Sequence, residues 1–243
     1  MSKIGVIILA AGKGTRMQSD IPKVCFKLAG KTLIQRVVDT SLKINADLIA
    51  IVVGYKKEMV IDTIEAHQNI HFVTQENQNG TGDAVKSAKE LFQRFDGNVF
   101  ILCGDVPLLK AETLQKMLDK HLEAKAHCTV LTMILNDPDK YGRMVRDDKG
   151  NVCEIVEFRD ATDEVKQIKE INTGIYVLNC KHLFDAIEEI NDQNNQNEYY
   201  LTDVLKIFYH KGLKIESIIL DDILEAAGVN SQEQLAEMEK HCR

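Results

Sequence analysis

The first half of the chain alternates short apolar runs with longer amphipathic stretches, and this alternation constrains the fold more than any other feature of the sequence. The runs with strand length are 4–10, 48–53, 71–73 and 98–103. The stretches with apolar residues at helical spacing are 32–44, 57–66 and 83–95. Strands that alternate with helices form right-handed crossovers and a mostly parallel sheet. Ligands bind beyond the carboxyl ends of such strands, so we expect chemistry in the loops after Leu9, Val53, Val73 and Leu102.

The second half has a different pattern. Strand-like segments lie at 126–134, 143–146, 152–158 and 171–178. Residues 147–151 (DDKGN) are typical of a hairpin turn, so we expect this segment to be antiparallel and to form a small lid beside the sheet. Helical stretches at 181–190 and 199–210, a strand at 215–220 and a helix at 231–240 capped by Ser231 follow. The predicted fold class is α/β, with a Rossmann-like, mostly parallel mixed sheet, helices on both faces and a small antiparallel insertion.

Charge and cysteine usage exclude several classes of protein. The formal net charge of −7 argues against binding nucleic acid by bulk attraction to phosphate, so the charge of a polyanionic ligand must be met locally. The six cysteines form no C-x-x-C pair, which argues against a zinc site and indicates a reducing, cytoplasmic location. The apolar start is too short to span a membrane and lacks the flanks of a signal peptide.

The strongest local motif follows the first strand and reads LAAGKGTRM from Leu9 to Met17. A strand that runs into a glycine-bearing turn can expose consecutive backbone N–H groups, and such a nest binds phosphate. It lacks the third glycine of a dinucleotide fingerprint and the G-K-[ST] of a P-loop. Arg16 and Lys23 are placed to hold the phosphates of a nucleotide. The alternatives are a glycine-rich turn without a ligand and two solvated surface cations.

A second candidate lies at the end of the fourth apolar run, in the sequence CGDVP from Cys103 to Pro107. A carboxylate at this strand end suits Mg²⁺, which prefers hard oxygens and commonly takes only one or two carboxylates beside substrate phosphates. The alternative for Asp105 is a turn cap.

The ordered set of motifs resembles the uridylyltransferase domain of bacterial N-acetylglucosamine-1-phosphate uridylyltransferases, within the sugar-phosphate nucleotidyltransferases. The resemblance covers nearly the whole chain. Its further motifs are PK at 22–23, LAGK at 28–31, QENQNGTG at 75–82, YGR at 141–143, IVE at 155–157, EINTG at 170–174, EYYLTD at 198–203 and GVN at 228–230. The first motif alone is shared by relatives that use other bases and substrates, whereas the ordered set is much more specific.

This resemblance implies a role for each matching position. The backbone that touches the nucleotide matches Leu9, Ala10, Ala11 and Gly12, with Cys103 and Gly104 beside it, while Arg16 and Lys23 match the catalytic groups on the phosphates. The loop that reads uracil and ribose matches Gln75, Gln78, Gly80 and Thr81. The Mg²⁺ ligands match Asp105 and Asn230, and the groups that hold the amino sugar match Gly142, Glu157, Asn172 and Tyr199. From the residues alone, 172–174 remains open to being a strand bulge and Asn230 to being a polar residue before a helix.

The resemblance implies transfer of UMP from UTP to N-acetylglucosamine 1-phosphate with Mg²⁺ as cofactor, by a domain over 1–228 and a C-terminal helix at 229–243. The nucleotide-binding half is about 1–110 and the sugar-binding half, with the insertion, about 111–228. Rival readings are a relative with another nucleotide or sugar phosphate and a non-catalytic nucleotide-sugar sensor.

The sequence also departs from this family's pattern. Most members continue into a β-helix acetyltransferase that drives trimer formation. This sequence has no hexapeptide-type repeat, so we expect no acetyltransferase activity and a monomer or weak homo-oligomer. Asp83 stands where His is common in the family, and it adds negative charge near the base-reading loop.

Overall fold

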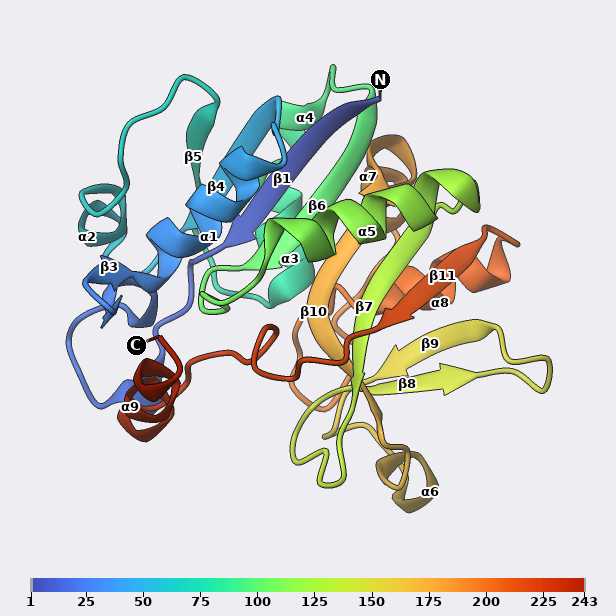
Figure 1. The fold of residues 1–243 in the computed structure, drawn as a ribbon. Helices are drawn as coiled ribbons and strands as arrows, with labels where there is room; N and C mark the ends of the chain where they lie inside the picture. The colour runs from blue at the N-terminus through green and yellow to red at the C-terminus, as the bar shows by residue number, and fades with distance from the viewer. Residues whose placement is uncertain (1, 243) are drawn as a thin grey trace.

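A nine-stranded mixed sheet forms the centre of the molecule, which is described for residues 2–242 from a computed structural model (Figure 1). The strands are β1 (Lys3–Leu9), β2 (Lys27–Leu28), β3 (Lys31–Thr32), β4 (Leu48–Val53), β5 (Ile70–Thr74), β6 (Gly97–Cys103), β7 (Cys128–Ile134), β8 (Arg143–Arg146), β9 (Val152–Val156), β10 (Glu170–Asn179) and β11 (Ile215–Ile219). Of these, β2 and β3 form a separate two-stranded sheet, and the other nine form the central sheet. The helices are α1 (Leu33–Lys43), α2 (Lys57–Ile61), α3 (Thr81–Ser87), α4 (Lys89–Phe92), α5 (Ala111–Glu123), α6 (Asp163–Lys166), α7 (Cys180–Ile187), α8 (Asp203–His210) and α9 (Gln232–Lys240), with two 3₁₀ turns, η1 (Thr15–Met17) and η2 (Lys23–Cys25). The main strand order is β11-β7-β10-β6-β1-β4-β5, so the predicted fold class is confirmed.

The four strands predicted in the first half lie side by side and parallel. β1 pairs with β4 on one side and β6 on the other, and β4 pairs with β5. Leu9 at the end of β1 is in register with Val52 of β4 and with Cys103 of β6. The carboxyl ends of these strands therefore meet at one edge of the sheet, as the sequence predicts.

Helices cover both faces of the sheet, which explains why its central strands are largely apolar. On one face, side chains of α1 and α5 such as Val37 and Leu114 pack on β1 residues Val6 and Ile8. On the other face, α3, α4, α7 and α8 pack around Ile7 and its neighbours (Figure 1). Successive β1 side chains thus enter opposite cores, as the two-residue repeat of a strand requires.

The antiparallel strands differ from the predicted lid. β7 and β10 are not beside the sheet but inside it, because β10 pairs antiparallel with β6 and β7, and β11 pairs parallel with β7. Only β8 and β9 leave the main path, as an antiparallel pair attached to β10 through Ile171 and Arg143. The prediction of an antiparallel segment is confirmed, and its placement as a separate lid is wrong for its two longest strands.

Helix lengths also differ from the sequence expectation. The longest helix, α5, lies in a region to which no element is assigned above, and two of its buried positions, Thr113 and His121, are polar. The predicted helix at 83–95 is divided into α3 and α4 at Ala88. The predicted helix at 199–210 begins only at Asp203, so Tyr199 lies in the loop before α8. The capping prediction for α9 is confirmed, because Ser231 accepts a hydrogen bond from the Gln234 N–H.

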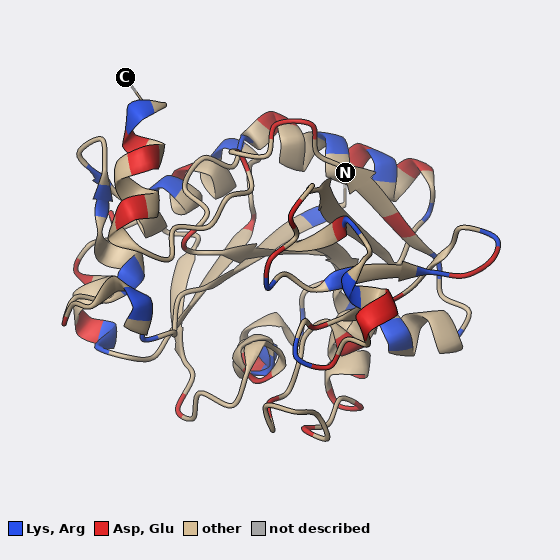
Figure 2. Cartoon of the chain, turned by 90° about the horizontal axis from the view of Figure 1, so that it is seen from below, with Lys and Arg blue, Asp and Glu red and all other residues tan. Residues whose placement is uncertain are grey.

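Charged residues are concentrated on helices and loops, and the two signs are interspersed in the view of Figure 2, where most of the central strands carry neither. Among residues 2–242, no helix combines the length and apolar character needed to cross a membrane.

Candidate active site

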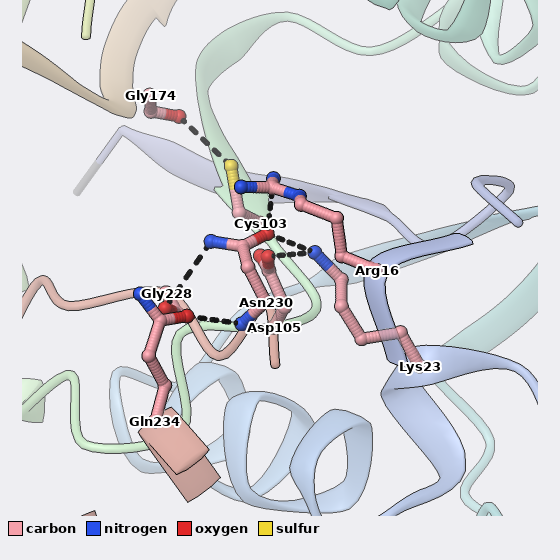
Figure 3. A network of polar contacts seen from close by, with 8 residues as sticks. All are labelled: Arg16, Lys23, Cys103, Asp105, Gly174, Gly228, Asn230 and Gln234. Atoms are coloured by element: carbon pink, nitrogen blue, oxygen red, sulfur yellow. Dashed lines mark hydrogen bonds and ion pairs between the residues drawn. The ribbon is translucent and has the colours of Figure 1, made fainter. Parts of the chain in front are cut away.

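Four side chains from distant parts of the sequence meet at the carboxyl edge of the parallel strands (Figure 3). Arg16 Nη2 donates to Asn230 Oδ1 at 2.9 Å, and Lys23 Nζ donates to the same oxygen at 2.8 Å. Lys23 also forms an ion pair with Asp105. We call Arg16, Lys23, Asp105 and Asn230 the strand-end cluster. Two cations and one carboxylate give it a net positive charge, which suits a polyanionic ligand.

Local backbone structure places the two cations. The glycine-bearing loop after β1 ends in η1, which carries Arg16, and η2 begins at Lys23. Gly14 has φ of 64°, and a Cβ there would lie 2.5 Å from the Lys23 Cβ. Only glycine fits this turn, because any side chain would displace Lys23 and strain the backbone.

The fourth member of the cluster comes from the C-terminal segment. The Val229 N–H donates to the Asp105 carbonyl at 2.9 Å, and the Asn230 N–H donates to Gln234 Oε1 at 2.8 Å. Beyond it, Val229 and Met238 pack with Met17 in a small apolar cluster. This packing fixes Asn230 opposite Asp105.

The donor set fits a magnesium ion. Within residues 2–242 no three His, Cys, Asp or Glu side chains come close enough to hold a metal together. The oxygens of Asp105 and Asn230 nevertheless converge on one cation, the Lys23 ammonium. A Cβ on Gly228 would lie 3.3 Å from Asp105 Oδ2, so the glycine keeps space open beside the carboxylate. Two hard oxygen ligands with open space suit Mg²⁺ that completes its shell with water and phosphate.

A cavity of about 210 Å³ adjoins the first loop on the side of β4 and β5. Seven of the residues predicted to bind nucleotide line it, namely Leu9, Ala11, Gly12, Gln75, Gln78, Gly80 and Thr81. The other three do not. Ala10 is buried, Cys103 donates from its thiol to the Gly174 carbonyl at 3.7 Å, and the Gly104 N–H bonds to the Leu9 carbonyl at 2.9 Å.

Hydrogen bonds hold the walls of this cavity together. Gln78 Nε2 donates to the Ala11 carbonyl at 2.9 Å, which ties the loop after β5 to the loop after β1. Thr81 Oγ1 accepts from the Leu201 N–H at 3.0 Å. Gly80 has φ of 112°, and a Cβ there would meet the Tyr199 carbonyl at 2.6 Å. The cavity is therefore a slot between the first loop and the segment before α8, with walls joined by hydrogen bonds.

Three of the predicted sugar-binding residues lie together on the insertion side. The Asn172 N–H donates to the Gly142 carbonyl at 3.0 Å, and a Cβ on Gly142 would lie 3.4 Å from Glu157 Oε2. Glu157 also accepts from the Thr202 hydroxyl at 3.2 Å. Burial, with the nearby charge of Asp160, raises the pKa of the Glu157 carboxyl.

A cavity of about 430 Å³ is lined by both Glu157 and Arg16, so one predicted sugar-binding residue and one member of the strand-end cluster share a surface. Its lining also includes Lys140 and Arg159, two cations that the sequence analysis does not single out. Burial, with the charge of Asp105 as a further cause, raises the pKa of Tyr141.

The fourth predicted sugar-binding residue, Tyr199, contacts the loop after β5 through its backbone. Tyr199 packs against the apolar core that contains Ile7. Its N–H donates to the Asn79 carbonyl and its carbonyl accepts from the Gly82 N–H, each at 2.7 Å, so its backbone pairs with the loop after β5. This pairing brings Glu198, which the sequence analysis does not single out, into the lining of the smaller cavity. The stretch 172–174 forms a bulge in β10, where the register shifts between Asn172 and Tyr176.

The Cys103 thiol does not have the character of a nucleophile. Burial and the neighbouring Asp105 charge raise the pKa of Cys103 to about 12, so the thiol stays protonated at neutral pH. The site therefore offers charge and hydrogen bonds, and the cysteine nearest to it offers no thiolate.

Comparisons with known proteins agree with this geometry. A family model described as nucleotidyl transferase matches residues 5–224. A protein named bifunctional protein GlmU from Clostridioides difficile is 44% identical over 237 residues, which is 98% of this chain and 51% of that protein. A protein of the same name from Carboxydothermus hydrogenoformans is 46% identical over 234 residues, 96% of this chain and 52% of that protein. The chain thus spans about half the length of these curated relatives.

A solved structure of a UDP-glucose pyrophosphorylase complexed with UDP-glucose superposes with a TM-score of 0.80. It covers 100% of this chain and 98% of that one at 20% identity, a likeness that concerns the fold.

Proposed function

The chain belongs to the nucleotidyl transferase family, and from this premise we propose that it transfers UMP from UTP to N-acetylglucosamine 1-phosphate, releasing pyrophosphate. The observation that supports this best is the strand-end cluster, because it gathers two cations with the side-chain oxygens of Asp105 and Asn230 at the carboxyl edge of the parallel strands. Similarity to the GlmU proteins favours a uridine nucleotide and an amino sugar as the substrates.

The reaction needs no general base in this proposal. The nucleophile is an oxygen of the sugar phosphate, whose second pKa is about 6, so it is largely anionic at neutral pH. It attacks the α-phosphorus of UTP in line, one P–O bond forms, and the bond to the pyrophosphate oxygen breaks. The main difficulty is bringing two polyanions together in that geometry.

The chain's own groups address this difficulty. Arg16 and Lys23 hold the phosphates and take up negative charge as pyrophosphate leaves, with backbone N–H groups of the first loop beside them. Asp105 and Asn230 would hold Mg²⁺, which when bound neutralises phosphate charge and orients the reacting oxygens. Gly142, Glu157 and Asn172 orient the sugar so that its phosphate faces the cluster.

The direct test is pyrophosphate release from a panel of nucleoside triphosphates and sugar 1-phosphates in the presence of Mg²⁺. We expect the highest kcat/KM for UTP with N-acetylglucosamine 1-phosphate. A higher kcat/KM with another pair would reassign the substrates within the family. Tight binding of a UDP-sugar without any pyrophosphate release would instead favour a sensor.

The role of Asp105 has its own test. Asp105→Ala is expected to lower kcat by roughly 10²–10³-fold with the fold intact, because it removes a charged ligand and no core packing. Asp119→Ala on α5 is the matched control, since it removes an exposed carboxylate away from the cluster. Near-normal turnover by a folded Asp105→Ala protein would refute the metal assignment.

A further inference from the structure

Asp83, in the first turn of α3, holds the side chain of Gln75 in one orientation. Gln75 is buried, with 5% of its surface exposed, at the end of β5. Its Nε2 donates to Asp83 Oδ2 at 2.7 Å and to the Gly80 carbonyl at 3.1 Å. A carboxylate and a backbone carbonyl can only accept, so both partners require the amide nitrogen on their side. The Gln75 carbonyl oxygen must point the other way.

That oxygen faces the cavity of about 210 Å³ beside the first loop, which we call the base-side cavity. Within the described chain, Gln75 Oε1 takes part in no hydrogen bond, and every fully buried side-chain polar atom there has a partner. Oε1 is therefore accessible, and the only cavity described above that Gln75 lines is the slot of about 210 Å³. The slot thus presents a fixed hydrogen-bond acceptor, and the Gly80 N–H, which has no partner among residues 2–242, is a donor on the same wall.

We propose that Asp83 is a positioning residue that locks the Gln75 carbonyl toward the nucleobase and so makes the site select uracil over cytosine. The inference rests on the proposed nucleotide site and names the group that sets its base preference. Uracil presents an N3–H donor beside its O4 acceptor, which matches an acceptor beside a donor on the protein. Cytosine presents an N3 lone pair beside an N4 amino group, which places acceptor against acceptor and donor against donor.

The carboxylate strengthens this lock. Hydrogen bonds to an ionised acceptor are roughly twice as strong as neutral ones, so Asp83 contributes more than the Gly80 carbonyl. Without Asp83, only the Gly80 carbonyl favours this orientation, so rotation of the Gln75 amide by half a turn costs less free energy and lets its NH₂ face the cytosine lone pair. Base selection by Gln75 therefore depends on a residue that need not touch the nucleotide.

The test measures binding, so that it does not depend on turnover. Dissociation constants for UTP and CTP with Mg²⁺ are measured by calorimetry on the full chain and on Asp83→Ala, Asp83→Asn and Glu76→Gln. We expect the UTP preference to fall about tenfold in Asp83→Ala, which corresponds to about 1.4 kcal/mol, with UTP weakened and CTP strengthened. Asp83→Asn should keep most of the preference, because its Oδ1 can still accept from Gln75. Glu76→Gln controls for loss of negative charge in the same loop, since Glu76 is exposed, and should leave the preference unchanged.

Three results would overturn the inference. The first is an unchanged ratio of the UTP and CTP dissociation constants in Asp83→Ala. The second is an equal loss of affinity for both nucleotides in that variant. The third is a change of the ratio in Glu76→Gln as large as that in Asp83→Ala. If Asp83→Ala does not fold, Asp83→Ser replaces it, because its hydroxyl is one bond too short to reach Gln75. Failure of the proposed function would give a different result: the protein would release no pyrophosphate, although it would still bind UTP more tightly than CTP.

Discussion

Acidification should destabilise this protein through one buried histidine. His121 on α5 is 2% exposed, and its two ring nitrogens lie 3.1 Å from the Thr129 hydroxyl of β7 and 3.2 Å from Asn98 Oδ1 of β6. Burial, with a smaller effect of His127, lowers the pKa of His121 from 6.5 to about 4. The folded protein therefore keeps a neutral ring under conditions in which the unfolded chain takes up a proton.

The sign and size of the effect follow from this difference. His121 stabilises the fold fully above pH 6.5, and its contribution is lost as the pH falls toward about 4. At about 1.4 kcal/mol per pH unit, the whole interval corresponds to about 3 kcal/mol, of which about 2 kcal/mol is lost by pH 5. This is a large share of the stability of an ordinary domain.

Urea denaturation at pH 7, 6 and 5 measures the effect, followed by far-UV circular dichroism because the chain has no tryptophan. His121→Gln is the matched variant, since its amide keeps hydrogen-bonding capacity and does not titrate. The free energy of unfolding of the natural protein should fall by about 2 kcal/mol more than that of His121→Gln between pH 7 and pH 5. Parallel profiles for the two proteins would refute the reasoning.

Two further predictions concern the sugar side. Glu157→Gln should raise the free energy of unfolding at neutral pH by about 0.5–1 kcal/mol, because burial raises the pKa of this carboxyl and so penalises its charged form, while KM for the sugar phosphate increases. Urea denaturation and initial-rate kinetics test both parts, and a lower stability would contradict the first. Gly142→Ala should destabilise by about 1–3 kcal/mol and raise the same KM, because its Cβ would lie 2.9 Å from Ile155 Cγ2 and press toward Glu157. Unchanged stability and KM would contradict this prediction, because they would show that the chain around Gly142 shifts to accommodate the added methyl group at no measurable cost.

The parallel half of the fold could be predicted because its signals are local. Each strand is an apolar run of the right length, and the carboxyl ends of parallel strands must share an edge, which brings Leu9 beside Cys103. The helix α5 has the same kind of signal in Leu114, Met117 and Leu118, but buried Thr113 and His121 interrupt its apolar stripe. A polar residue on a buried face hides an element that periodicity would otherwise reveal.

The rest depends on contacts between distant residues, which no local pattern encodes. The position of β10 between β6 and β7 follows from pairings across the whole second half, so a strand that looks like part of a lid belongs to the core. Glu198 reaches the base-side cavity only because the backbone of Tyr199 pairs with Asn79 and Gly82. The pairing of Asn230 with Asp105 is implied by the family resemblance and by no local pattern. The structure brings the two side chains together on the Lys23 ammonium. Their role as metal ligands stays a prediction.

The bond from the Val229 N–H to the Asp105 carbonyl has a consequence for biosynthesis. The nucleotide-side loops, β6 and both cations are translated early, yet Asn230 leaves the ribosome after almost all of the sheet has been made. A nascent chain therefore carries Arg16, Lys23 and Asp105 long before it carries Asn230, the last member of the strand-end cluster. If the proposed function holds, an unfinished polypeptide would lack the complete strand-end cluster, and activity would appear only after residue 230 has been made.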